Sequence, residues 1–198
     1  MIITAIKAQV KNPNRVSVFI DGAYSFSLSL DELLETKLKN RQEISSVELK
    51  KLQQLSNDGK LRMRAFEWLM IRPRSARELT DYLRKKQASD ELAQKILGDA
   101  QKRKYQDDAA FAAWWVDQRR SGKQRSARYI TQELAAKGVA REVIAESLIQ
   151  NTTSDSDTLR TLIGKKRRSV RYSDDKKLTE YLVRQGYSYS LVKELLAE

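Results

Sequence analysis

The 198-residue sequence contains no cysteine and no histidine. Without these side chains there can be no thiol nucleophile, no Ser-His or Cys-His catalytic pair, and no zinc site made of Cys and His ligands. The sequence also lacks a glycine-rich loop that could cradle phosphates. We therefore expect a protein that is not an enzyme and that binds neither a metal nor a cofactor. The lack of cysteine agrees with a reducing compartment.

Glycine and proline are scarce, at 7 and 2 residues. All-β and disordered chains use more of both, so this composition favours a mainly helical fold. Long apolar runs are missing too, and no window approaches the ~18 apolar residues of a membrane-spanning helix. The first residues, MIITAIKAQVKNPN, lack the apolar run of a secretory signal. We expect a soluble protein of the cytoplasm.

Charge is abundant and unevenly distributed. The sequence has 38 Lys and Arg against 26 Asp and Glu, a net charge of +12. Residues 1–60 hold 9 cations and 7 anions, whereas residues 61–198 hold 29 and 19. A positive field of this kind favours polyanions such as nucleic acid, or an acidic protein surface.

The first thirty residues follow a strand pattern. In VSVFIDGAYSFSLSL, apolar residues alternate on both sides of Asp21-Gly22, a strong signal for a two-residue hairpin turn. IITAIKAQV can add a third strand. We therefore predict a small antiparallel β element at residues 1–30 and linker helices at residues 31–60, one of them opened by a capping box between Ser45 and Glu48.

The rest of the chain repeats a helical unit. LTDYLRKKQASDELAQKIL (79–97), ITQELAAKGVAREVIAESL (130–148) and LTEYLVRQGYSYSLVKELL (178–196) align without a gap. Each contains a helix, a turn and a second helix. Gly138 and Gly186 are suited to the left-handed conformation that ends the first helix, whereas Gln87 in the first copy costs about 1 kcal/mol more there.

An additional helix precedes each of these pairs, although it is less distinct in the third copy. The fold class we predict is mainly α. It consists of three tandem three-helix repeats, at residues 61–104, 105–150 and 155–198, that form an elongated curved array. The small antiparallel β element precedes them.

Three motifs in this part resemble a known family. RPRSARELTDYLRKK, YQDDAAFAAWWVDQR followed by SARYITQELAAKGV, and LVRQGYSYSLVKELL stand in the order and spacing of the three tandem motifs of the RecX regulatory proteins. The resemblance covers about residues 61–198 and leaves the β element outside. Gln87 departs from the usual glycine of the family, and the first helix of the third copy aligns poorly.

The resemblance implies a function and partners. RecX proteins are non-enzymatic modulators of the RecA recombinase. They lodge in the groove of the RecA–single-stranded DNA filament and usually inhibit strand exchange and ATP hydrolysis, which affects recombination, DNA repair and the SOS response. The implied partners are the RecA filament and single-stranded DNA, with double-stranded DNA as a further candidate. We expect a monomer. The family supplies no contact residues that can be transferred position by position.

The candidate binding residues are therefore chosen by charge. They are the cations of three clusters: Arg72, Arg74, Arg77, Arg84, Lys85, Lys86, Arg119, Arg120, Lys123, Arg125, Arg128, Lys165, Lys166, Arg167 and Arg168. For any one of them a solvated helix surface is the more ordinary explanation. Residues 119–128, RRSGKQRSAR, rank first because Gly and Ser predict a loop where cations can converge. The run 165–171 ranks second, with a flexible connector as its alternative.

This ranking makes a testable hypothesis about residues 119–128. Reversal of Arg120, Lys123 and Arg125 to glutamate should weaken filament binding without lowering thermal stability.

Aromatic and acidic residues allow two more hypotheses. Trp68, Trp114, Trp115 and Phe111 could stack on bases, but Phe111 and Trp115 lie four apart on an apolar helix and favour the core. Trp114 points about 100° away from Trp115; the core is favoured for it too, with partial exposure as the alternative. The adjacent carboxylates Asp107-Asp108 could bind a metal, yet they fit better as N-terminal residues of a helix, where its dipole favours negative charge.

Other functions compete with filament binding. The helix pairs resemble helix-turn-helix units, although SDELAQK, AREVIAE and SYSLVKE, which would open the recognition helices, are nearly neutral. A carboxylate-dependent nuclease would need several Asp or Glu gathered in space. A scaffold for another acidic protein and a basic helical nucleic-acid-binding protein acting independently of RecA remain as alternatives.

Overall fold

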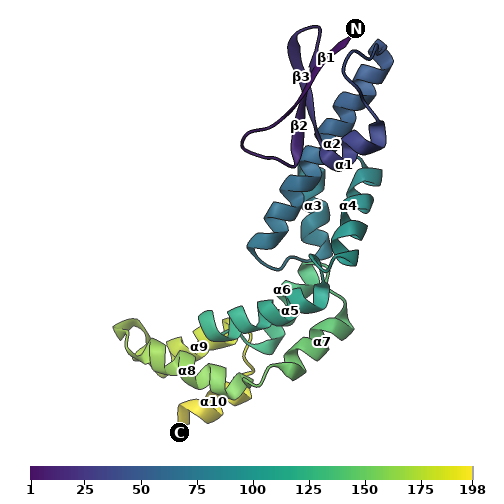
Figure 1. Cartoon of the computed structure of the whole chain (residues 1–198). Coiled ribbons are helices and arrows are strands. Elements are labelled where there is room, and N and C mark those ends of the chain that lie inside the picture. Colours follow the sequence, from purple (N-terminus) through teal and green to yellow (C-terminus); the bar gives the residue numbers. More distant parts are fainter. Residues whose placement is uncertain (198) are drawn as a thin grey trace. The chain divides into compact units, whose positions relative to one another are not determined.

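The computed structural model describes residues 1–197 and is mainly helical, with one small sheet (Figure 1). Both features confirm the predicted fold class. The elements in chain order are β1 (Ile3–Ala8), β2 (Arg15–Ile20), β3 (Ala23–Ser29), α1 (Leu30–Thr36), α2 (Ser46–Ile71), α3 (Ala76–Lys85), α4 (Asp90–Lys102), α5 (Asp108–Asp117), η1 (Gln118–Gly122), α6 (Ala127–Ala136), α7 (Arg141–Gln150), α8 (Asp155–Arg167), η2 (Val170–Tyr172), α9 (Asp175–Arg184) and α10 (Tyr189–Ala197).

The chain divides into two compact units, which we describe separately. The first unit comprises Met1–Trp68 and Leu83–Ile96. The second unit comprises Leu69–Tyr82 and the chain from Leu97 onward.

The sheet of the first unit is antiparallel, with strand order β1-β2-β3. Asp21 and Gly22 connect β2 and β3 with φ angles of 48° and 85°. Two successive residues with positive φ are what a type I′ hairpin requires, because its twist matches that of the strands. The predicted hairpin and the predicted third strand are therefore confirmed.

Helices α1 and α2 complete the core of this sheet. The core is formed by buried apolar residues of the strands and of the segment before α2: Ile3, Val16, Val18, Ile20, Phe26, Leu28 and Ile44. Leu33 of α1 and Leu52 of α2 pack against it. The capping box between Ser45 and Glu48 is present, with hydrogen bonds of 3.1 and 2.8 Å. Residues 31–60 are thus part of the packed unit.

Helix α2 differs from the sequence prediction in its length. We expected one helix to begin at Ser45 and another to form near residue 61, but α2 runs without interruption as Ser46–Ile71. Gly59 lies at the expected break and stays helical. A single glycine costs a helix about 1 kcal/mol relative to alanine, which does not end it.

Two hydrophobic cores lie in the second unit. Helices α5, α6 and α7 share the first, whose buried residues are Phe111, Ala112, Trp115, Val116, Ile130, Leu134, Val139 and Ile144. Helices α8, α9 and α10 share the second, formed by Leu159, Leu162, Leu178, Leu182, Tyr187, Val192 and Leu195. Helix α8 begins with a capping box made by Ser154 and Asp157, so the helix that aligned poorly by sequence is well formed.

Neighbouring helix pairs of the second unit meet at two joints of the same design. In the first joint the Ser75 hydroxyl donates a 2.8 Å hydrogen bond to the carbonyl of Lys137, which follows the last residue of α6. Asp108, the first residue of α5, accepts a 2.8 Å bond from the backbone N–H of Ala76. The end of α6 and the start of α5 therefore both bond to the N-terminus of α3.

The second joint repeats these bonds one helix pair later. The Ser126 hydroxyl donates to the carbonyl of Gln185 at 3.1 Å, and Asp155, the first residue of α8, accepts from the N–H of Ala127 at 2.9 Å. Each joint serine also caps its own helix. The four residues RSAR occur at both joints, at 74–77 and at 125–128.

The three turns inside the helix pairs, two of which dock into these joints, differ in whether they require glycine. Gln87, Gly138 and Gly186 all have positive φ, at 60°, 80° and 93°, as predicted. A Cβ at Gly138 would lie 3.0 Å from Cβ of Arg77, and one at Gly186 would lie 3.2 Å from Cβ of Tyr129. The side chain of Gln87 is exposed. At Gln87 a side chain therefore costs only the strain of the left-handed backbone. At Gly138 and Gly186 a side chain would also collide with a neighbouring residue.

Candidate nucleic-acid and protein-binding surface

Arg120, from the segment that ranked first, is part of the protein interior. It is 6% exposed, its guanidinium forms an ion pair with Asp155, and it donates a 3.3 Å hydrogen bond to Thr158. Gln118–Gly122 is a π-helical turn that continues α5, where a loop was expected. Reversing Arg120 would bury a carboxylate beside Asp155. We therefore expect the reversal of Arg120 to lower thermal stability, in contrast to the hypothesis for residues 119–128.

Two more cations of this segment are held by aromatic rings. Arg119 donates a 2.6 Å bond to Glu133 and lies 3.9 Å from the centre of the Trp115 ring. Arg125 lies 4.2 Å from the centre of the Tyr129 ring. Such contacts restrict both guanidinium groups, since desolvated cation–π pairs are worth about 1–2 kcal/mol. These contacts stabilise the second unit and make both guanidinium groups less accessible to a partner.

Lys123 and Arg128 remain exposed in the same segment. Their side chains are open to solvent, unlike that of Arg120. The segment from 119 to 128 therefore offers two cations where the sequence suggested five.

The cluster at Arg72 is also partly internal. Arg72 bonds to Glu78 at 3.1 Å and lies 5.2 Å from the centre of the Trp114 ring. Burial lowers the pKa of Arg74 from its ordinary value, and the nearby charge of Arg72 acts in the same direction. We expected both to be left to solvent or a partner. Arg77 is more open, with 60% of its side chain exposed.

Glu78 organises this cluster. It accepts bonds from Arg72 and, at 2.6 Å, from the ammonium group of Lys137. Burial alone would raise the pKa of Glu78, but these bonds and charges outweigh it and hold the pKa below its usual value. Ser75 and Glu78 have the spacing of a capping box, and Ser75 caps α3, but the Glu78 carboxylate does not bond back to Ser75, so only half of the box forms.

Arg84, Lys85 and Lys86 belong to the first unit. They are exposed at the C-terminal end of α3. Cations are favoured there by the helix dipole, which gives them a structural role whether or not they bind a partner.

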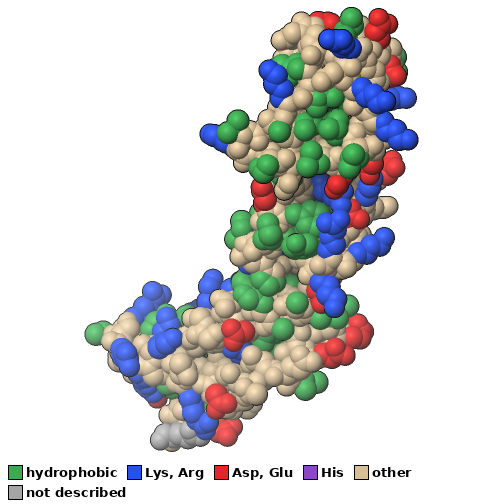
Figure 2. Space-filling view, in the orientation of Figure 1, with side chains coloured by type: hydrophobic (Ala, Val, Ile, Leu, Met, Phe, Trp, Pro, Cys, Tyr) green, Lys and Arg blue, Asp and Glu red, His purple; other side chains and the backbone are tan. Residues whose placement is uncertain are grey.

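A dense exposed positive surface is the tip formed by residues 165–177, which connects α8 to α9. It contains seven Lys and Arg and two Asp. Figure 2 shows Lys and Arg side chains gathered over this end of α8 and α9. Lys165, Arg168, Arg171, Lys176 and Lys177 are all exposed. The run that ranked second by sequence is thus the better candidate.

The tip is structured. Lys166 lies 4.7 Å from the centre of the Tyr181 ring and 5.5 Å from that of Tyr172. Arg167 pairs with Asp175 at 2.6 Å. These contacts tie the last turn of α8 to α9, so the run is no flexible connector. They also keep Lys166 and Arg167 in place while their neighbours point to solvent.

The aromatic and acidic candidates have structural roles. Phe111 and Trp115 are buried, as expected, and Trp114 is half-buried. Asp107 caps α5 by accepting a 2.8 Å bond from the N–H of Ala109. Within residues 1–197, no group of three or more Asp or Glu side chains is placed to bind a metal. Over the same residues, no helix has the length and apolar character needed to span a membrane.

The residues that sequence reasoning missed are the carboxylates Glu78, Glu133 and Asp155, which hold the buried cations. One signal was available for Asp155, since each RSAR segment begins a helix pair, and an aspartate, Asp108 or Asp155, opens the helix that follows that pair.

Comparisons with known proteins agree on one family. The family model of the regulatory protein RecX N-terminal domain matches residues 1–45, and the model of the second three-helix domain of RecX matches residues 107–148. The β element, which the motif comparison left outside the resemblance, is therefore a RecX element as well.

Relatives and solved structures extend this match. Regulatory protein RecX of Bacillus licheniformis is 32% identical over 203 residues, which covers 99% of this chain and 76% of the relative. That of Bacillus subtilis is 29% identical over 199 residues, covering 96% and 74%. A crystal structure of regulatory protein RecX superposes with a TM-score of 0.73 at 21% identity, covering 100% of this chain and 99% of the other. RecX from Lactobacillus salivarius gives 0.59 at 18%, covering 71% and 94%. The chain belongs to the RecX family of regulatory proteins.

Proposed function

We propose that this protein modulates RecA recombinase, with inhibition as the expected direction, by binding in the groove of the RecA–single-stranded DNA filament. The observation that carries the proposal is the RecX relationship, which spans 99% of the chain. The net charge of +12 supports it, because a filament groove presents DNA phosphates and acidic protein side chains to its occupant. Such modulation would act on strand exchange and on ATP hydrolysis.

The mechanism we propose is steric and electrostatic. A protein lodged in the groove blocks the path of a second DNA strand and restrains the filament subunits, and neither effect needs a covalent step. We therefore propose a regulatory protein that is not an enzyme.

The surface we assign to this role consists of the exposed cations of the candidate set. In the second unit these are Arg77, Lys123, Arg128, Lys165, Arg167 and Arg168, of which Arg167 is also paired with Asp175. Arg84, Lys85 and Lys86 are their counterparts in the first unit. Arg72, Arg119, Arg120, Arg125 and Lys166 are held by the ion pairs and ring contacts described above, and Arg74 is partly buried.

The experiment that tests the proposal compares two binding targets. The purified protein is titrated against RecA–single-stranded DNA filaments and against the same DNA without RecA, over a series of salt concentrations, and RecA ATP turnover is followed. Tighter binding to filaments, with altered ATP turnover, is the expected result.

A general nucleic-acid-binding function is the second candidate, and the same high positive charge favours it. It predicts equal affinity for both targets and a steep loss with salt, because counterion release would then supply the binding free energy. That result would contradict the RecA proposal.

A further inference from the structure

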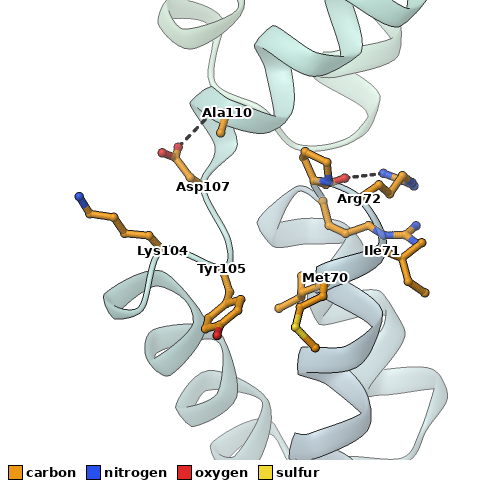
Figure 3. Close-up of a pocket in the computed structure, with 10 residues that line it drawn as sticks. Met70, Ile71, Arg72, Lys104, Tyr105, Asp107 and Ala110 are labelled. Carbon is orange, nitrogen blue, oxygen red and sulfur yellow. Dashed lines mark hydrogen bonds between the residues drawn. The ribbon is translucent and has the colours of Figure 1, made fainter.

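A pocket in the second unit is not explained by the cationic surface. It has a volume of about 350 Å³ and lies between the last turn of α2 and the segment that connects α4 to α5 (Figure 3). Met70 and Ile71 line it from α2, and Tyr105 and Ala110 line it from the other side. Figure 3 shows Met70 and Tyr105 on facing sides of the opening.

The walls of the pocket expose large apolar side chains. Met70 is 63% exposed, Ile71 is 75% exposed and Tyr105 is 44% exposed. A single exposed apolar side chain is common, but three that converge on one hollow are typical of a contact surface. Methionine is suited to such a surface, because its flexible side chain adapts to different apolar partners.

The rim of the pocket is positive. Lys104 lines it, and Lys102 and Arg103 are exposed directly before it. Lys104 has a φ of 57°, a left-handed conformation that glycine would adopt at lower cost. Hydrogen bonds from Lys104 N–H to the carbonyl of Gln101 and from Tyr105 N–H to that of Ala100 hold this turn. The turn places a cation and an aromatic ring side by side at the opening.

These walls suit an apolar amino-acid side chain better than a nucleobase. Proteins that bind single strands without sequence preference use open aromatic platforms, whereas here Tyr105 faces Met70 across the hollow. The side chains of Met70, Ile71 and Pro73 offer no hydrogen-bond donors to the polar edges of a base, so a base that lies against them leaves polar groups unsatisfied. A backbone phosphate would also meet the carboxylate of Asp107.

We propose that this pocket binds a bulky apolar side chain from an acidic segment of a partner protein, with the flanking carboxylates on Lys102, Arg103 and Lys104. The inference rests on the proposed function, in which the segment belongs to the protein component of the filament. It assigns the pocket to protein contact and leaves DNA contact to the tip.

The test uses three variants of the full chain. Met70→Glu places a carboxylate in the pocket. Lys104→Gly removes the rim cation while relieving its backbone. Ile149→Glu is the control, because Ile149 is 82% exposed on α7 and does not line the pocket. Each variant is titrated against RecA–single-stranded DNA filaments and against the bare DNA, and its thermal midpoint is measured.

The proposal predicts a selective loss. Met70→Glu should weaken filament binding about tenfold while bare-DNA binding stays within about twofold, because burying a charge against a docked apolar group is costly. Lys104→Gly should weaken filament binding although its thermal midpoint rises. Ile149→Glu should change neither affinity. Unchanged filament binding by Met70→Glu, or an equal loss on both targets, would overturn the inference.

A synthetic probe separates this inference from the RecA proposal. If the wild-type protein does not prefer filaments, the proposed function fails. A fluorescent peptide with one phenylalanine between runs of glutamate is then compared with the same peptide carrying glycine. A preference for phenylalanine that Met70→Glu abolishes supports the pocket, and the absence of any preference rejects it.

Discussion

The side chain of Ser126 donates a hydrogen bond to the backbone carbonyl of Gln185, which lies 59 residues further along the chain. Ser126 is fully buried, and it also caps α6. Ser75 bonds to Lys137 in the same way one helix pair earlier. The equivalent residue before α9 is Asp174, which caps that helix and is exposed. A buried serine therefore stands at the start of the two helix pairs that bond to the turn of the next pair, and the last pair has an exposed aspartate in its place.

Gly186 is the position where this joint leaves least room. We expect Gly186→Ala to lower the free energy of unfolding by about 2 kcal/mol, since a positive φ and a displaced neighbour each cost about 1 kcal/mol. Urea unfolding measures it. The matched control is Gly164→Ala in α8, where an added Cβ meets open space. It should stabilise the protein by about 0.5–1 kcal/mol. Equal effects of the two substitutions on stability would contradict the close packing at the joint.

Arg120 and Arg128 should respond differently to alanine substitution. Arg120→Ala leaves Asp155 without its buried partner and should cost about 3 kcal/mol in urea unfolding. Arg128 is exposed, so Arg128→Ala should stay within about 0.5 kcal/mol of the wild type. Stability losses of similar size would show that the burial of Arg120 is not maintained in solution.

Glu78 predicts how stability depends on pH. Its pKa in the folded protein lies below the ordinary 4.5, because bonds from Arg72 and Lys137 outweigh the effect of burial. A depressed pKa stabilises the folded state above the unfolded pKa, and this contribution is lost as the pH falls through the folded value. Glu78→Gln should therefore be less stable than the wild type at pH 7, and the difference should shrink below about pH 4.5. A difference independent of pH would contradict the assignment.

The tip should contribute to binding beyond its share of net charge. Lys165→Gln with Arg168→Gln removes two exposed cations from it. We expect filament affinity to fall about tenfold and the salt dependence of single-strand binding to become shallower, by about 0.7 per lost phosphate contact. The control is Lys11→Gln with Lys50→Gln, two exposed cations of the first unit. An equal loss of filament affinity in the two double variants would mean that only the net charge of the protein determines binding.

The elements of the fold could be predicted to the extent that local pattern encodes them. Alternation around Asp21-Gly22 indicated a hairpin, and repeated apolar spacing indicated the helix pairs with their left-handed turns. The length of α2 could not be predicted in this way, because Gly59 weakens a helix without ending it.

The candidate site was less predictable. Residues 119–128 ranked first on charge density, yet the partners of Arg119 and Arg120 lie 14 and 35 residues away. Charge density does not reveal such partners. The tip ranked second, although its cations lie close to their own anions in sequence and most of them stay exposed.

By itself the sequence determined the helical class, the hairpin, the repeated helix pairs and the excess of positive charge, since all of these depend on composition and on short-range periodicity. The tertiary structure alone decided which cations are available to a partner. Burial and ion pairing are set by residues that meet across the joints, such as Lys137 and Glu78, 59 positions apart. A buried charge is stable only beside such a partner, and the density of charge along the sequence does not identify that partner.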